Sequence, residues 1–349
     1  MLNFSNSQLD KLAAHFVGNK TLDEDLKLTS EIVNGLDESV LSLLLQYFMG
    51  PFKSTGEYYH LKHETSLELN EIYAFVSKIF EDETSFLEQS QNIAKHLYEK
   101  STHPKVKAGD MYVGYFSNCV VEDEEMDCIG IFKSENKDKY LKVYNNQHGY
   151  EMAADEGINI NKLDKGCLIF NVEKDKGYIV VLVDNLNKQE GALYWKDEFL
   201  KVKPREDNYY HTQGYMKMYD NFVQDKLKVD YDVSKADEID IQNRTKKFFK
   251  EKETFDFQEF ANDVIQQPEI IDKFRTFKHE YQETHEVTIA DEFNISDKAV
   301  KKQSKFYKSI IKLDKNFHIY VHGNKENIEK GVDENTGMNF YKLLFREES

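Results

Sequence analysis

A cluster of lysines near the C-terminal end of the chain is the feature with the clearest chemical consequence. Residues 298–315 contain seven lysines and one acidic residue, Asp314, so this segment has a net charge of +6. If residues 297–309 form a helix, successive side chains are about 100° apart, and five lysines share an arc of roughly 120°. These are Lys298, Lys301, Lys302, Lys305 and Lys308. The opposite side carries Ala299, Val300, Phe306 and Tyr307.

The apolar side of such a helix would dock against a core, leaving the lysine side in water. A lysine stripe of this kind can neutralise several phosphates and release their counterions. Because lysine dominates over arginine, we expect contacts with the DNA backbone and no reading of base edges. The alternative interpretation is a solvated helix face, which charged stripes usually are.

A second set of residues has the order found in metal-dependent nucleases. Asp127 lies on one predicted strand, and Glu135 and Lys137 follow in the next turn. Two carboxylates and a lysine can hold a divalent metal and activate water, but only with Glu135 and Lys137 on a strand. Residues 134–138 have the composition of a turn, and acid–lysine pairs are common in a chain that is 31% charged. We therefore expect no catalytic residues here.

Histidine pairs do not predict a metal site either. His318 and His322 would share one face of a strand, but four residues at about 3.3 Å each separate them by roughly 13 Å. His60 and His63, with Glu64, have a suitable spacing only on a helix, which residues 58–62 do not resemble. The sequence contains no glycine-rich phosphate loop, no GxSxG and no HExxH. We expect neither a metal nor a cofactor.

Composition limits the class of protein. The chain has 349 residues, 40% of them apolar, which suits two folded domains. Its net charge of −17 opposes non-specific binding to nucleic acid, so any DNA contact must come from a local basic surface. Three cysteines, Cys119, Cys128 and Cys167, form no CxxC and are expected to be buried free thiols. No signal peptide or membrane span is evident, so we expect a cytoplasmic protein.

Helices and strands both occur in the predicted elements that position these residues. Asp37 is a plausible N-cap for a helix over residues 38–49, stopped by Gly50-Pro51. Further helices are predicted over 68–80 and 85–100, after short strands at 11–17 and 26–29. From residue 109 the period changes to that of strands, at 111–121, 127–133, 139–143, 166–172 and 178–184. Their short links predict an antiparallel sheet of about five strands.

The rest of the chain is predicted to be mainly helical. Helices fit residues 194–200 and 209–225, and a charged stretch at 226–240 suggests a domain boundary. Beyond it we expect helices at 242–252, 256–266 and 269–285, and one that Ser296 would cap and that runs to about Ser309. Strands at 317–321 and 338–345 would close the chain. The fold class is thus α+β, with an N-terminal domain at 1–230 and a C-terminal domain at 231–349.

Several sequence segments, spread over most of the chain, resemble those of a known family. The matching segments are Ser85-Phe86-Leu87 to Ala94-Lys95-His96-Leu97, Phe132-Lys133 with Tyr140 to Val143, Ile158 to Gly166, Trp195 to Leu200, and Val300 to Gly323. In order and spacing they resemble the 37-kilodalton nucleoid-associated family of bacteria, in its Bacteroidetes-like form. The resemblance implies association with the nucleoid and supplies no catalytic residues.

The leading hypothesis is therefore a non-enzymatic nucleoid-associated protein. It would bind DNA without sequence specificity, or a DNA-bound protein, through the lysines near residue 300. The first alternative is a metal-dependent nuclease or related DNA-processing enzyme. The second is a protein-binding scaffold without DNA contact, which would suit the acidic composition. The partners would be nucleoid DNA or nucleoid proteins and not a membrane, and the sequence leaves a homo-oligomer open.

Overall fold

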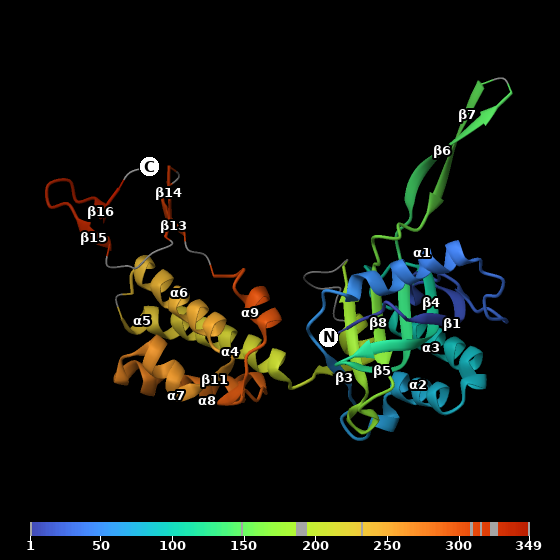
Figure 1. Ribbon diagram of the computed structural model, residues 1–349, viewed down its shortest axis with the longest axis horizontal. Coiled ribbons are helices and arrows are strands. Elements are labelled where there is room, and N and C mark those ends of the chain that lie inside the picture. The colour runs from blue at the N-terminus through green and yellow to red at the C-terminus, as the bar shows by residue number, and fades with distance from the viewer. Residues whose placement is uncertain are drawn as a thin grey trace. The chain divides into compact units, whose positions relative to one another are not determined.

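The computed structural model describes residues 2–147, 149–185, 194–231, 233–307, 310–314, 316–321 and 327–347. It divides the chain into two units, Met1–Arg205 and Glu206–Ser349. Unit 1 is built on an eight-stranded sheet whose described pairings are all antiparallel, in the order β10-β3-β9-β8-β5-β4-β1-β2 (Figure 1). The strands are β1 (Gln8–Val17), β2 (Leu26–Lys27), β3 (Tyr59–Leu61), β4 (Gly109–Val121), β5 (Glu124–Ser134), β8 (Lys165–Phe170), β9 (Ile179–Asp184) and β10 (Val202–Pro204).

Helices cover both faces of this sheet. Odd-numbered residues of β5, such as Ile129 and Ile131, pack in a core with α2 (Glu71–Glu81) and α3 (Phe86–Lys100). Even-numbered residues, such as Phe132, pack in a second core with α1 (Glu38–Met49). Because successive residues of a strand point to opposite faces, a strand buried on both sides reads as a continuous apolar run.

The local signals of unit 1 are confirmed. Helix α1 begins after Asp37, whose side chain accepts a hydrogen bond from the Val40 amide. Strands β8 and β9 form the predicted hairpin, and Gly177 in its turn has φ +105°. A β-carbon at Gly177 would lie 2.1 Å from the Leu61 carbonyl oxygen, so glycine is required there.

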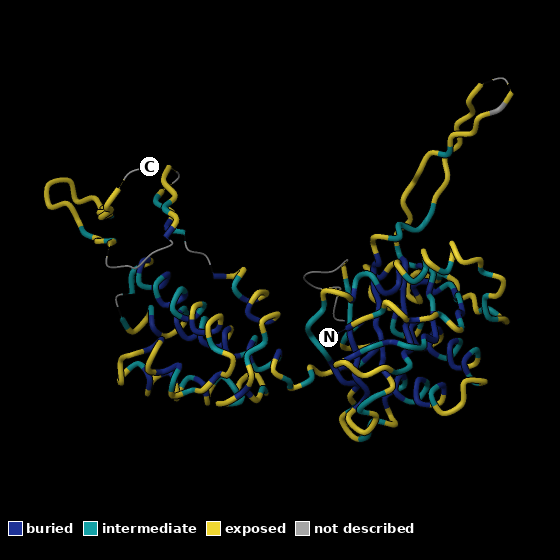
Figure 2. The backbone as a smooth tube through the Cα atoms, viewed as in Figure 1, coloured by how far each residue is buried: buried dark blue, intermediate teal, exposed yellow. Residues whose placement is uncertain are grey.

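One predicted sheet strand lies elsewhere. Residues 139–143 belong to β6 (Asp138–Asn146), which pairs with β7 (Gly149–Gly157) and with no strand of the large sheet. This hairpin projects from unit 1, and its residues are exposed along most of its length (Figure 2). We expected β6 to be a strand of the large sheet, but β5 pairs with β8 there. Period-2 alternation indicates a strand, but it does not indicate which strand lies beside it.

Unit 2 is mainly helical. Its helices are α4 (Asn208–Phe222), α5 (Lys228–Asp230), α6 (Lys235–Glu251), α7 (Phe257–Phe260), α8 (Pro268–His285) and α9 (Asp297–Gln303). The core is aromatic: the ring of Tyr215 has its centroid 4.1 Å from that of Phe255 and 5.4 Å from that of Phe260. Three two-stranded pairs complete the described part: β11 (Thr254–Asp256) with β12 (Glu292–Asn294), β13 (Ile310–Leu313) with β14 (Phe317–Tyr320), and β15 (Ile328–Val332) with β16 (Asn339–Leu343). The α+β class is thus confirmed.

The division between the units falls upstream of the predicted boundary at residue 230. Helix α4 follows the division, and its Tyr215, Tyr219 and Phe222 are buried in the core of unit 2. The charged residues 226–240 contain α5 and the start of α6. The N-terminus of α6 is capped by a capping box between Ser234 and Asp237. That the two units fold independently stays a prediction.

Candidate nucleic-acid interface

Helix α9 is held against α4 by two hydrogen bonds and an apolar face. The Ser296 amide donates to Thr212 Oγ1 (3.0 Å), and the Tyr307 hydroxyl donates to the Met216 carbonyl (3.1 Å). Ala299 and Val300 are buried between these two points. Ser296 occupies the N-cap position, but its side chain makes no capping hydrogen bond. The docked side of the helix is thus the one that the sequence predicts, except for Phe306, which is 65% exposed.

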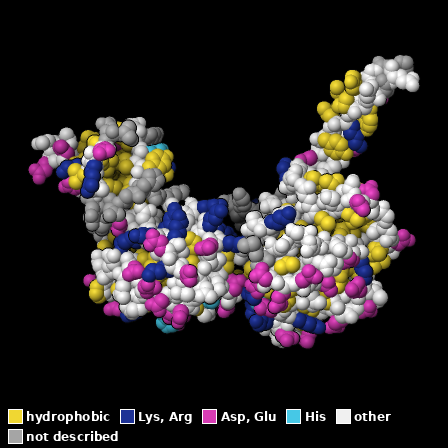
Figure 3. Space-filling view, in the orientation of Figure 1, with side chains coloured by type: hydrophobic (Ala, Val, Ile, Leu, Met, Phe, Trp, Pro, Cys, Tyr) yellow, Lys and Arg dark blue, Asp and Glu magenta, His cyan; other side chains and the backbone are white. Residues whose placement is uncertain are grey.

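The lysine arc is shorter than predicted. Helix α9 ends at Gln303, so it carries Lys298, Lys301 and Lys302, while Lys305 lies in the turn that follows. All four lysines are exposed, and Lys308 lies outside the described residues. Residues 304–306 form a turn in place of the predicted last helical turn, and Tyr307 after it still reaches α4. Figure 3 shows Lys and Arg side chains gathered over this part of unit 2.

Two of these lysines, Lys301 and Lys305, are not neutralised in the way that is common elsewhere in unit 2. Lys273 pairs with Asp230, and Lys228 and Lys235 both pair with Glu238. By contrast, Lys301 and Lys305 form no ion pair with any residue that the structure describes. The ammonium of Lys302 lies 5.7 Å from the centroid of the Tyr209 ring, which fixes its stem against α4. The surface around α9 is therefore a local excess of positive charge on an acidic protein.

The nuclease-like residues do not converge. The Asp127 carboxylate accepts a hydrogen bond from the Tyr115 hydroxyl (2.8 Å). The Glu135 carboxylate lies 3.3 Å from the ammonium of Lys133 and accepts from the Tyr194 hydroxyl (3.2 Å). Lys137 pairs with Asp110 (2.9 Å). Each group has a structural partner, and Asp127 and Glu135 lie eight residues apart, about 26 Å along an extended chain.

Two buried lysines near Glu135 were missed by the sequence reasoning. Lys133 and Lys165 are cross-strand partners on β5 and β8, and both are fully buried. Each has its own carboxylate: Glu135 for Lys133, and Asp184 for Lys165, at 2.8 Å. Burial lowers the pKa of Lys133, and the negative charge of Glu135 opposes that shift. Lys165 follows Asp164 at the start of an apolar strand. A lysine at the start of a strand is usually exposed, so the sequence does not indicate that Lys165 is buried.

Two of the histidines considered above, His60 and His63, contact other groups of the protein. His60 lies on strand β3, and its Nε2 is 2.6 Å from the Glu173 carboxylate. His63 Nδ1 accepts from the Thr65 amide, and His322 lies outside the described residues. In the part of the chain that the structure describes, no group of three or more His, Cys, Asp and Glu residues could hold a metal ion. The three cysteines are buried and free, which confirms that prediction.

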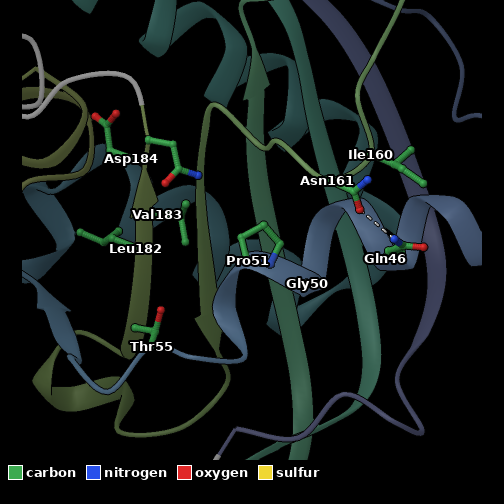
Figure 4. A pocket seen from close by; sticks show the side chains of 10 residues that line it. Gln46, Gly50, Pro51, Thr55, Ile160, Asn161, Leu182, Val183 and Asp184 are labelled. Atoms are coloured by element: carbon green, nitrogen blue, oxygen red, sulfur yellow. Dashed lines mark hydrogen bonds between the residues drawn. The ribbon is translucent and has the colours of Figure 1, made fainter. Parts of the chain in front are cut away.

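A polar cavity of about 520 Å³ lies between α1, β9 and the segment after β7 (Figure 4). Gln46 and Asn161 meet at its rim, where the Gln46 amide donates to Asn161 Oδ1 (3.1 Å). Asp184 also lines the cavity, but its carboxylate accepts two hydrogen bonds from the Lys165 ammonium, at 2.8 and 2.9 Å. The acid is therefore committed to a structural ion pair. None of the described helices is long and apolar enough to cross a bilayer.

Together these features define an acidic α+β protein with a localised lysine surface on its second unit. The family model of the nucleoid-associated protein YejK matches residues 14–337, which is nearly the whole chain. The chain therefore belongs to this nucleoid-associated family, and the resemblance seen in the sequence is confirmed. No curated protein matches the sequence significantly.

Proposed function

We propose that this protein binds the DNA backbone without sequence preference, through Lys298, Lys301, Lys302, Lys305 and Lys308. The observation that carries the proposal is the exposure of the four described lysines, three of them on α9 beside its buried apolar face and Lys305 in the turn that follows. A docked helix fixes the backbone positions of its lysines, and their long side chains can reach a row of phosphates. Family membership supports the proposal, because it associates the chain with the nucleoid.

The chemistry of lysine accounts for the expected lack of specificity. An ammonium group is a compact point charge that contacts phosphate oxygens, whereas base reading usually needs the planar fork of arginine or an amide. The proposed role is binding and not catalysis, because the acid–lysine set is divided among separate structural contacts. A DNA-bound protein with an acidic surface is the second candidate partner, favoured by the same lysines.

The test is DNA affinity as a function of salt for the full chain and two charge-matched variants. The first carries Lys298→Glu, Lys301→Glu and Lys305→Glu, and retains Lys302 because it packs on Tyr209. The control carries Lys53→Glu, Lys62→Glu and Lys95→Glu, three exposed lysines of unit 1. Both variants change the net charge equally, so a difference between them reports position.

Five phosphate contacts, one for each lysine, predict a slope of about −4.5 in log affinity against log salt, or a loss of about 500-fold between 50 and 200 mM. We expect the control to keep this slope and the α9 variant to lose binding at every salt concentration. Equal binding by both variants would show that the lysines are a solvated face. A wild-type protein that fails to bind DNA at low salt would transfer the proposal to a nucleoid protein as the partner.

A further inference from the structure

The hairpin of β6 and β7, residues 138–157, is here called the hairpin arm; the structure describes all of it except residue 148. Its cross-strand pairs include Leu141 with Ala154, Val143 with Met152, and Asn145 with Tyr150. Paired residues of antiparallel strands point to the same side, and so do pairs two residues apart along the strand. These three pairs therefore form one face of the arm, which we call the apolar face.

The apolar face is strongly exposed. Leu141 is 70% exposed, Val143 58%, and Met152 and Tyr150 each 73%. Figure 3 shows hydrophobic side chains along the arm, with no part of unit 1 covering them. A two-stranded hairpin is marginally stable in water on its own, because it has too little buried apolar surface. The arm therefore needs a surface that covers this face.

The opposite face of the arm combines charged residues with two half-exposed tyrosines, Tyr140 and Tyr144. The Lys142 ammonium pairs with Asp155 at 2.5 Å and lies 5.6 Å from the centroid of the Tyr140 ring. Tyr144 lies opposite Glu151 on this same side. The charged residues Lys142, Glu151 and Asp155 lie on this face, whereas the apolar face has its one charged pair, Lys139 with Glu156, at the root of the arm.

The charge of the arm indicates that this partner is not DNA. The arm contains four acidic residues and two lysines, a net charge of −2. Phosphates would be repelled, so a binding mode in which the arm enters a DNA groove is disfavoured. An apolar protein surface is the chemistry that the face fits, and the same face of a second copy offers such a surface.

We propose that the hairpin arm is a dimerisation element, and that the apolar faces of two copies pack against each other with their tips pointing in opposite directions. A twofold axis across the strands at the level of Val143 and Met152 brings each of these residues over its own equivalent. It also places Tyr150 of one copy over Ala154 of the other, and Leu141 over Asn145. The largest residue of the face, Tyr150, then meets the smallest, Ala154, so that the two sheet layers can approach closely at this point.

The amount of surface is near what a specific dimer requires. The apolar face presents roughly 500 Å² in each copy, or about 1,000 Å² in total, near the lower limit for a specific interface. Helix α1 extends this surface at the root of the arm: Val40 and Leu43 are exposed there. The hydrogen bond from Gln46 to Asn161 fixes α1 beside the chain that leaves the arm. In the antiparallel arrangement the tip of the second copy reaches this root.

The experiment measures the mass of the full chain in solution over a range of concentrations, by light scattering and sedimentation. We expect the wild type to have twice the chain mass of 41.1 kDa. Val143→Glu with Met152→Glu places like charges at the twofold axis and should raise the dimer dissociation constant by at least about 100-fold. The matched control, Tyr144→Glu with Ala153→Glu, adds the same charge to the opposite face and should remain a dimer.

A second measurement reports the orientation of the two copies. Met152→Cys should react with a bifunctional maleimide of about 10 Å span, the distance between packed sheets, to give a covalent dimer. Tyr144→Cys should not, and the native cysteines are all buried. A wild-type monomer at all concentrations would overturn the proposal. So would dissociation of both variants to the same extent, or cross-linking at residue 144 and not at residue 152.

Discussion

Replacing Glu135 with alanine should reduce the free energy of unfolding of unit 1 by about 3–5 kcal/mol, because it leaves a buried ammonium without its carboxylate. Glu135 Oε1 lies 3.3 Å from Lys133 Nζ, and the two side chains are only 3% and 0% exposed. In the variant, the Lys133 ammonium would keep its hydrogen bond to the Lys107 carbonyl (2.6 Å). It would also still face Lys165 on the neighbouring strand, without a nearby negative charge of its own.

The assay is urea unfolding of the full chain, followed by the fluorescence of its single tryptophan. Trp195 is 1% exposed and packs against Phe199 in unit 1, so its emission reports the unfolding of that unit. Thermal melting should fall by roughly 10 °C, given the size of the unit. Glu99→Ala, which removes an exposed ion pair with Lys20, is the control and should cost less than about 1 kcal/mol.

A double variant distinguishes two causes of lost stability: the loss of the ion pair itself, and the burial of an unpaired charge. Lys133→Met with Glu135→Leu removes both charges and keeps the volume, so it should recover most of the stability lost by Glu135→Ala. The pH dependence gives a further check. Burial lowers the pKa of Lys133 from its usual 10.5, so below that value the folded chain binds fewer protons than the unfolded chain, and stability rises with pH. In Glu135→Ala this rise should begin at lower pH. A wild-type urea midpoint for Glu135→Ala would refute the reasoning.

Three further predictions concern catalysis, pH and domain structure. The wild type, incubated with plasmid and Mg²⁺ or Mn²⁺, should produce no nicks; nicking that disappears in Glu135→Gln would establish the nuclease alternative. Burial lowers the pKa of His15 from 6.5 to about 4, so the folded chain resists its protonation. Unit 1 should therefore lose stability as pH falls from 6.5 toward 4, and His15→Gln should flatten that dependence in urea titrations followed by Trp195. Limited digestion with a glutamate-specific protease should first cut near Glu206 and leave two resistant fragments; first cleavage within 226–240 would support the boundary predicted from composition.

The features that the sequence predicted well are those decided within a few residues. The cap at Asp37, the end of α1 before Pro51, and the turn at Gly177 each depend on local backbone chemistry. The apolar face of α9 follows from the spacing of Ala299 and Val300, which is also a local property. These predictions needed no knowledge of which elements meet in space.

The features that the sequence did not predict depend on distant contacts. Strand β1 lies between β2 and β4 because Leu12 pairs with Gly114, about a hundred residues away, and no local pattern encodes that pairing. Lysine is usually a surface residue, and only the fold shows that Tyr194 and Glu135 enclose Lys133. The end of α9 at Gln303 was likewise not predicted, because residues 297–309 fit one continuous helical pattern. Tertiary contacts thus decided what propensity left open.

The position of β10 at the edge of the large sheet has a consequence for biosynthesis. Strand β3 lies between β9 and β10, so its two neighbours are synthesised more than a hundred residues after it. At roughly 5–20 residues per second, β3 waits on the order of ten seconds for β10. During that time Tyr59 and Leu61, which end in the core, are without their sheet partners. Unit 1 should therefore complete its folding late in translation, close to the moment when the first helix of unit 2 emerges.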